Sequence, residues 1–374
     1  MYLFERIVGV MTYMSVMLIM VYLIYKSPKE KLKKYLIIYN ILLFVMAFFY
    51  IPATSADLYR LTKTMNYYSG FALSELPKLL SNNNAPVQIL YFYIIGKLGI
   101  DNLLPAITSF IFYGNVFIII YKNSKRFNLS NKSIAISLFF FMVMGKFVEV
   151  ISGIRTMLAF SIIALCCYNE ILEKRSFIKD IIFYLIASLI HPAAMILTFI
   201  RIIFLLFQKE NKIIKKISNI IVFTVLIIFI VTYGKTYMQY ALNKANTYIN
   251  GNVYSYVWEY VISWLYIVFS TYSMILGKKY LNKNIEIAGM RLFIIYINII
   301  IICFSFEYSI FSRFQAFSSI LFVPIFSIIL NQVLEEHTDK NKRYMIMFCV
   351  ISALIFFIIG IRGNLSGYKY ILFT

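Results

Sequence analysis

Residues 133–170 read SIAISLFFFMVMGKFVEVISGIRTMLAFSIIALCCYNE, and this stretch decides the fold. It holds two apolar runs, at about 133–149 and 153–170. Each run is close to the roughly 20 residues that a helix needs to cross a bilayer. The runs meet at GKFVEVISG, so we expect a hairpin of two membrane helices. One permanent cation, Arg155, lies inside the second run, and its presence there needs an explanation.

The rest of the chain has the same apolar character. Of its 374 residues, 61% are hydrophobic, 18% are aromatic and only 14% are charged, and the mean hydropathy is +0.79. A soluble domain is about half apolar and about a quarter charged. Apolar runs of membrane length recur from end to end, and no stretch is long and polar enough to form a soluble domain. We therefore predict an all-α polytopic membrane protein in which residues 1–374 form a single transmembrane domain.

Composition and motifs also indicate which functions the chain lacks. The formal net charge of +20 comes mostly from lysines in short loops between apolar runs, which is typical of cytoplasmic loops. We therefore expect no nucleic-acid partner. The four cysteines lie in apolar segments without metal-like spacing to histidine, so disulfides and zinc are not expected. No Walker loop, GxGxxG or HExxH motif occurs, and we predict no metal and no cofactor.

The basic loops orient the chain, because lysine and arginine accumulate on the cytoplasmic side of a membrane. These loops are 26–34, 122–132, 173–179, 208–216, 278–284 and 335–343. Between two consecutive basic loops the chain must cross the membrane outward and cross back, which predicts about 11–13 membrane segments. Outer loops are expected at about 54–85 and 234–255. Further spans are predicted at about 218–233, 256–276, 286–306, 309–330 and 343–361.

Two segments are too short for ordinary spans. Residues 180–207 cannot hold two full crossings and contain IHPAAM at their middle. Because proline disfavours helix at the preceding residue and is welcome at the first helical position, we predict two half-spans that break at His191 and open outward. Residues 86–98 form a run of about 13 residues after Pro86, which we interpret as a re-entrant or interfacial helix. The alternative is that the basic loop 122–132 lies outside.

On this topology the unusual polar residues gather at the outer level, around an outward-facing cavity. They are Asp57, Arg60, Glu149, Arg155, His191, Glu307 and Arg313. A charge at mid-membrane costs about 2.5–3.5 kcal/mol on insertion scales, so such residues usually pair or face a wet cavity. Arg155 follows Ser152-Gly153 in the first turn of a helix, where free N–H groups and the positive dipole end also attract anions. Two guanidinium groups, of Arg155 and Arg313, therefore predict a phosphate or pyrophosphate site.

Other interpretations of these residues stay open. Arg155 and Arg313 could extend to the outer headgroups and do nothing else. His191 could be a helix-cap residue, and Glu149 and Glu307 could pair with nearby cations. Arg201 and Arg291 lie nearer the inner ends, so we interpret them as topology residues. Among the aromatic residues, the outer-loop tyrosines Tyr59, Tyr67 and Tyr68 are candidates for stacking on sugars.

Three segments together resemble the EpsG/Wzy-type polysaccharide polymerases. They are SGIRTMLAFSIIALCCYNE at 152–170, ASLIHPAAMIL at 187–197 and SRFQAFSSILFVPIF at 312–326. The likeness consists of a small-Gly-x-Arg motif opening a helix, a histidine before small residues, and an arginine opening a late helix. The element SADLYR at 55–60 is similar to an acidic-tyrosine element of the family, although its spacing differs from Asp-Tyr-x-x-Tyr. A His-Pro pair stands in place of His-Ser. The resemblance covers about residues 50–330.

The resemblance implies a membrane glycosyltransferase of the bacterial plasma membrane. Such enzymes join oligosaccharide repeat units carried on undecaprenyl pyrophosphate at the outer face, for capsule, exopolysaccharide or O-antigen, without a nucleotide sugar. We expect Arg155, Arg313 and Arg60 to bind the pyrophosphate and His191 to accept the proton of the attacking hydroxyl, with Glu149 as the alternative base. Asp57 and Tyr59 are expected to contact the acceptor sugar. Membrane lipid, a chain-length regulator and a flippase of the same pathway are the expected partners.

Rival functions need a similar cationic cavity. A flippase for lipid-linked oligosaccharide would carry polar residues on both sides of mid-membrane and usually a repeated set of helices, which the sequence does not show. An O-antigen-ligase-like transferase would use the same donor with a different acceptor, and the sequence does not separate it from a polymerase. A membrane acyltransferase would favour an earlier catalytic histidine, and none precedes His191. A purely structural membrane protein would not need the outward arginines.

Overall fold

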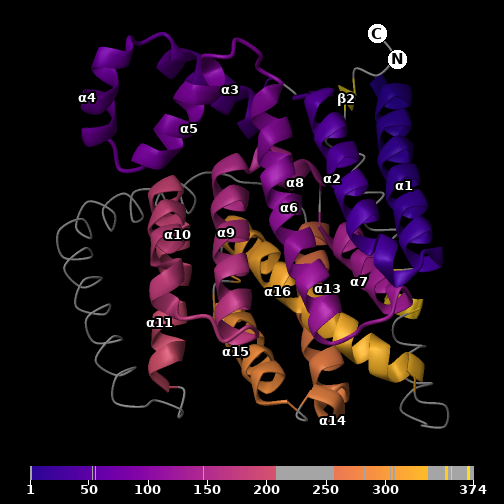
Figure 1. The fold of residues 1–374 in the computed structure, drawn as a ribbon. Helices are drawn as coiled ribbons and strands as arrows, with labels where there is room; N and C mark the ends of the chain where they lie inside the picture. The colour runs from indigo at the N-terminus through magenta and orange to yellow at the C-terminus, as the bar shows by residue number, and fades with distance from the viewer. Residues whose placement is uncertain are drawn as a thin grey trace.

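The protein is a bundle of helices that run roughly along one direction (Figure 1). This computed structural model describes residues 2–52, 54, 56–145, 147–207, 257–281, 284–303, 305, 308–335, 350–352, 355 and 369–370. Within these residues the only sheet is an antiparallel pair of two-residue strands, β1 (Tyr50–Ile51) and β2 (Lys369–Tyr370). Five of the described helices are long and apolar enough to cross a membrane, and four shorter helices are also apolar. The prediction of an all-α polytopic membrane protein is confirmed.

The helices fall into two packed groups around two central ones. The first group holds α1 (Tyr2–Lys26), η1 (Lys29–Lys31), α2 (Leu32–Phe48), α6 (Leu103–Arg126), α7 (Asn131–Met144) and α8 (Phe147–Ser152). The second holds α10 (Phe177–Ile190), α11 (Pro192–Phe207), α13 (Val257–Leu276), α14 (Lys278–Leu281) and α15 (Ile285–Cys303). The central helices are α9 (Ile154–Ile171) and α16 (Tyr308–Glu335). Their most apolar windows are 83% and 89% buried, against 39% for α1, so α9 and α16 form the core.

The basic loops that the structure describes lie together at one end of the bundle, which we call the basic end. The Lys29 ammonium, between α1 and α2, donates to the side-chain and backbone oxygens of Asn128, at 2.9 and 3.1 Å. Glu286, at the start of α15, pairs with Lys174 at 2.6 Å and with Arg126 at 3.5 Å. The loops that follow α1, α6 and α9 therefore meet at the same end, as the positive-inside argument requires.

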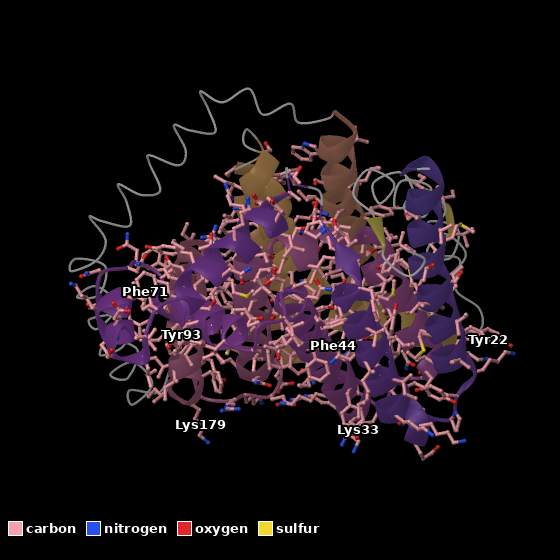
Figure 2. The ribbon with its side chains drawn as sticks, turned by 90° about the horizontal axis from the view of Figure 1, so that it is seen from above. Tyr22, Lys33, Phe44, Phe71, Tyr93 and Lys179 are labelled. Atoms are coloured by element: carbon pink, nitrogen blue, oxygen red, sulfur yellow. The ribbon has the colours of Figure 1, made fainter. Side chains whose placement is uncertain are left out.

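The opposite end carries a layer of short helices, which we call the cap. The cap consists of α3 (Asp57–Ser69), η2 (Leu73–Glu75), α4 (Leu76–Ser81) and α5 (Pro86–Gly96). It lies across the ends of the longer helices (Figure 1). Seen from this end, Phe71 and Tyr93 lie together at one side of the molecule (Figure 2), and the Tyr93 hydroxyl donates to the Phe71 carbonyl at 3.5 Å. The predicted outer loop 54–85 is therefore largely helical.

The cap folds because α3 is amphipathic. Its buried residues are Leu58, Leu61 and Met65, at i, i+3 and i+7, which lie on one face of a helix. This face packs on α5. At about 1.5 Å per residue, the 11 residues of α5 extend only about 16 Å, roughly half of the hydrocarbon thickness. The segment thus does not cross, in agreement with the predicted re-entrant or interfacial helix, and α6 is the next helix to cross.

A glycine sets the close approach of α3 to α5. A Cβ built on Gly96 would lie 2.6 Å from the Ser69 Cβ and 3.1 Å from the Met65 carbonyl oxygen. We expect Gly96→Ala to lower the free energy of unfolding by about 1–3 kcal/mol, because overpacking displaces backbone. The double variant Ser69→Gly/Gly96→Ala removes the nearer contact and should recover part of this loss. Thermal unfolding in detergent, with limited proteolysis between α3 and α5, measures both. Equal stability of Gly96→Ala and wild type would contradict this packing.

The structure refines several of the predicted boundaries. The run 133–149 divides into α7, which ends at Met144, and the short helix α8. The predicted break at His191 is confirmed, because α10 ends at Ile190 and α11 begins at Pro192. The predicted spans 218–233 and 343–361, the outer loop 234–255 and Glu307 lie outside the described residues, apart from a few positions near 350.

The prediction that Arg201 lies nearer the inner end is confirmed, because its partner Glu170 is in the last turn of α9, but its interpretation as a topology residue is wrong. Its guanidinium is not at an inner surface but is 1% exposed, and its Nε donates to the Glu170 carboxylate at 2.9 Å. The Glu170 side chain is 2% exposed. The guanidinium also lies 5.4 Å from the Phe293 ring centre. The pair thus joins α9 to α11 inside the bundle. The sequence did not identify Glu170 as the partner of Arg201, because a separation of 31 positions does not show that two residues meet.

Candidate functional site

Arg155 owes its position to the turn between α8 and α9. The Gly153 N–H donates to the Glu149 carbonyl at 2.7 Å, which closes α8, and the Gly153 carbonyl accepts from the Met157 N–H at 2.9 Å, which opens α9. A Cβ on Gly153 would lie 2.7 Å from the Glu149 carbonyl oxygen, so glycine is needed at this position. The turn therefore places Arg155 in the first turn of α9, at the end of the bundle that carries the cap.

The Arg155 side chain points toward the cap. Its Nη1 donates to the Gln88 side-chain oxygen on α5 at 3.3 Å. Burial raises the pKa of Tyr68 on α3, and the positive charge of Arg155 opposes that rise, so the two side chains lie near each other. Among the residues that the structure describes, no carboxylate lies within 4.0 Å of the Arg155 guanidinium. A permanent cation is thus held below the cap by a neutral amide, with its charge available to an anion.

His191 occupies the junction between α10 and α11. Its N–H donates to the Ala187 carbonyl at 3.1 Å, and its Nδ1 accepts from the Ala193 N–H at 3.2 Å. The side chain is 7% exposed. Because Nδ1 acts as an acceptor, a neutral His191 ring carries its proton on Nε2. The histidine is therefore a helix cap that has an N–H donor on its other nitrogen.

A pocket lies between the central helix α16 and the α7–α8 junction. Its walls come from α6, α7, α8, α9, α13 and α16, and Glu149 is its one acidic residue among those described. Asn331, near the far end of α16, accepts from the Ser130 N–H at the basic end, at 2.7 Å. The first turns of α16, which line the pocket, therefore lie nearer the cap. The lining residues are Phe112, Tyr113, Phe141, Met144, Gly145, Glu149, Val150, Met157, Ser263, Ser312, Gln315, Ala316 and Ser319.

Arg313 flanks this pocket without being part of its wall. It follows Ser312, which lines the pocket, and successive helical residues point about 100° apart. Its side chain is half-buried. The neighbouring Phe314 packs on Phe160 of α9, with ring centres 5.8 Å apart. Arg155 and Arg313 therefore lie on the two central helices, near the same end of each.

The remaining candidates lie on the surface of the cap. The Arg60 guanidinium pairs with the Asp57 carboxylate at 2.8 Å, and their side chains are 70% and 52% exposed. The Tyr59 ring lies under the Lys63 ammonium, at 4.6 Å. The structure gives no contact between these three residues and Arg155. They form a separate polar surface on α3, above the half-buried Arg155.

Two glutamines of this region were not predicted from the sequence. Gln88 contacts Arg155 from α5, and Gln315 lines the pocket from α16. Gln88 lies in an otherwise apolar helix, and Gln315 comes two residues after Arg313. A polar side chain so close to a suspected site residue is a signal that could have identified Gln315. Gln88 had no such signal, because only the folded cap brings α5 over α9.

The fold and site define a class of protein: a polytopic helical membrane protein with polar and cationic groups collected below a cap, at the end opposite its basic loops. The sequence matches the EpsG family over residues 59–372. This is most of the chain, which therefore belongs to the EpsG family of polysaccharide-biosynthesis membrane proteins. Neither the curated proteins nor the solved structures contain a match.

Proposed function

We propose that this protein polymerises oligosaccharide repeat units carried on undecaprenyl pyrophosphate, at the outer face of the bacterial plasma membrane. Membership of the EpsG family supports a polymerase of polysaccharide biosynthesis. The observation that carries the proposal is the position of Arg155, which opens a core helix at the end opposite the basic loops and, among the described residues, hydrogen-bonds to the neutral amide of Gln88. A half-buried cation of this kind suits the pyrophosphate of a lipid-linked donor.

In the proposed reaction, a hydroxyl oxygen of the acceptor sugar attacks the anomeric carbon of the donor. The bond between that carbon and the pyrophosphate oxygen breaks, and the electron pair leaves with undecaprenyl pyrophosphate. Arg155 and Arg313 stabilise the negative charge that develops on the leaving group. The free N–H groups at the start of α9 add to this field. Asp57, Tyr59 and Arg60 would meet sugars of the chain on the cap surface.

The acceptor hydroxyl must lose a proton to a base. Of the two candidates, Glu149 faces the pocket beside α16. His191 uses Nδ1 to cap α11, so it would have to give up this hydrogen bond or accept at the nitrogen that already carries a proton. We therefore assign proton acceptance to Glu149. We assign to His191 the donation of a hydrogen bond from Nε2 toward a phosphate oxygen of the donor.

Replacing Glu149 with glutamine should slow polymer formation by about 10²–10⁴-fold, the usual contribution of a general base. The substitution keeps the size of the side chain and removes its ability to accept a proton. Glu173→Gln is the matched control, because Glu173 lies at the basic end in a pair with Lys122 at 2.7 Å. Chain extension of purified protein in lipid nanodiscs measures both. A Glu149→Gln protein that extends chains at the wild-type rate would exclude Glu149 as the base.

Deleting the gene from its bacterium separates this function from its rivals. Loss of a polymerase leaves single repeat units on undecaprenyl pyrophosphate at the outer face, where added periodate oxidises them in intact cells. Loss of a flippase leaves single units that periodate cannot reach. Loss of a ligase leaves long chains on the carrier. The proposal requires the first result, with recovery of long chains when the wild-type gene is restored, and either of the other two contradicts it.

A further inference from the structure

The pocket between α16 and the α7–α8 junction combines polar groups with aromatic walls. Hydroxyl groups come from Ser263, Ser312 and Ser319, an amide comes from Gln315, and a carboxylate comes from Glu149. The aromatic part of the wall is formed by Phe112, Tyr113 and Phe141. Among the lining residues that the structure describes, none is a lysine or an arginine. Such a mixture of many neutral hydrogen-bonding groups with aromatic surface is suited to a neutral polyol and not to an anion.

Gln315 is the side chain that most directly indicates a ligand. It is 8% exposed, so it is buried in the wall of the pocket. In the part of the chain that the structure describes, its amide makes no hydrogen bond. Its amide atoms are not among the fully enclosed polar atoms that lack a partner in the described residues, so the amide reaches the open space of the pocket. The amide therefore stands ready to donate to, and accept from, a molecule that enters the pocket.

A neighbouring hydrogen-bond network holds this wall in place. The Ser318 hydroxyl donates to the Asn298 side-chain oxygen at 2.7 Å and accepts from the Tyr266 hydroxyl at 3.1 Å. The Asn298 amide in turn donates to the Ser270 hydroxyl at 3.1 Å. These contacts join α16 to α13 and α15. Because Ser318 lies between Gln315 and Ser319 in sequence, the network fixes the turn of α16 that faces the pocket.

We propose that this pocket binds one sugar ring of the acceptor, apart from the pyrophosphate. The inference rests on the proposed function and adds a binding subsite to it. Gln315 and the serine hydroxyls would hydrogen-bond to ring hydroxyls, and the aromatic residues would cover an apolar face of the sugar. The Glu149 carboxylate would repel a phosphate and accept a proton from the bound sugar. Arg155 points toward the cap instead, so donor phosphate and acceptor sugar occupy different walls of the site.

Saturation-transfer NMR tests the pocket without requiring turnover. The probes are methyl glycosides of glucose, galactose, N-acetylglucosamine, mannose and rhamnose, presented one at a time to the protein in nanodiscs. We expect saturation transfer to at least one glycoside, unaffected by added inorganic pyrophosphate. Gln315→Leu should weaken its binding about tenfold, the effect of one lost hydrogen bond to a buried group. Gln332→Leu, the same change on the same helix at a half-buried position, should bind as wild type does.

Three results would overturn the assignment. They are the absence of transfer to every glycoside, equal transfer in wild type and Gln315→Leu, and displacement of the glycoside by pyrophosphate. Chain extension by the wild-type protein is measured in parallel and tests the polymerase function separately. If wild type and Gln315→Leu extend chains with the same dependence on acceptor concentration, the polymerase stands and the sugar subsite lies elsewhere. If Gln315→Leu fails to fold, Gln315→Glu and Gln315→Asn replace it, and unchanged glycoside binding in both would also overturn the assignment.

Discussion

Arg155→Ala should reduce polymer formation by about 10²–10³-fold while the protein still folds. This is the typical cost of removing one group that stabilises charge developing in a transition state. The guanidinium contacts Gln88 at 3.3 Å, and no described carboxylate depends on it for neutralisation, so its loss leaves no buried charge unpaired. The measurement is the amount and length of glycan on undecaprenyl pyrophosphate at matched protein levels.

Two further variants separate charge from geometry at Arg155. Arg155→Lys keeps the charge but loses the planar fork that contacts two phosphate oxygens, so it should retain a fraction of activity between those of alanine and wild type. Arg126→Ala is the matched control at the basic end, where Glu286 keeps Lys174 as a partner at 2.6 Å. Wild-type polymer from Arg155→Ala, or an equal loss in Arg126→Ala, would show that Arg155 has no special role.

The second large effect is expected from the buried ion pair of Glu170 and Arg201. Both side chains are nearly inaccessible, and the two atoms that pair are 2.9 Å apart. Removing one partner leaves a buried charge without its counterion, which costs about 3–5 kcal/mol in protein interiors. We therefore expect Glu170→Leu and Arg201→Met, made singly, to lower the unfolding temperature sharply and to reduce the yield of folded protein.

The double variant makes this prediction specific. Glu170→Leu/Arg201→Met removes both charges and leaves an apolar contact between α9 and α11, so it should recover most of the stability lost by either single change. Thermal unfolding in detergent measures all three variants against wild type. If the single losses simply add in the double variant, the two residues do not act as a pair. Chain extension by the double variant then reports whether the pair serves stability alone.

The sequence predicted those parts of the fold that local pattern determines. Run length and apolarity predicted α9, α13, α15 and α16, because a bilayer requires about 20 apolar residues in a row. Pro192 predicted the break between α10 and α11, since proline cannot continue a helix from the preceding residue. Gly153 before Arg155 predicted where α9 begins. In each case the feature that determines the helix lies within the helix itself or next to its end.

The parts that were not predicted depend on contacts between distant segments. The 54–85 segment appeared to be a loop, yet Leu58, Leu61 and Met65 form a helical face that finds α5 as its partner. The inner-end position of Arg201 was predictable, but its burial and its ion pair with Glu170 were not. Gln315 could be recognised as a candidate ligand-binding residue only from the structure, in which it lines a pocket together with residues of α8 and α13. The sequence shows that each of these side chains is present, but it does not show which distant side chains they contact.

Chain extension by purified protein tests the central claim most directly. The wild-type protein in nanodiscs receives undecaprenyl-pyrophosphate-linked repeat units extracted from its own bacterium, and the products are separated by length. The account predicts a ladder of products that differ by one repeat unit and remain on undecaprenyl pyrophosphate, and its loss in Arg155→Ala. Folded wild-type protein that yields no product longer than one repeat unit, or that moves the glycan to another carrier, would contradict the account.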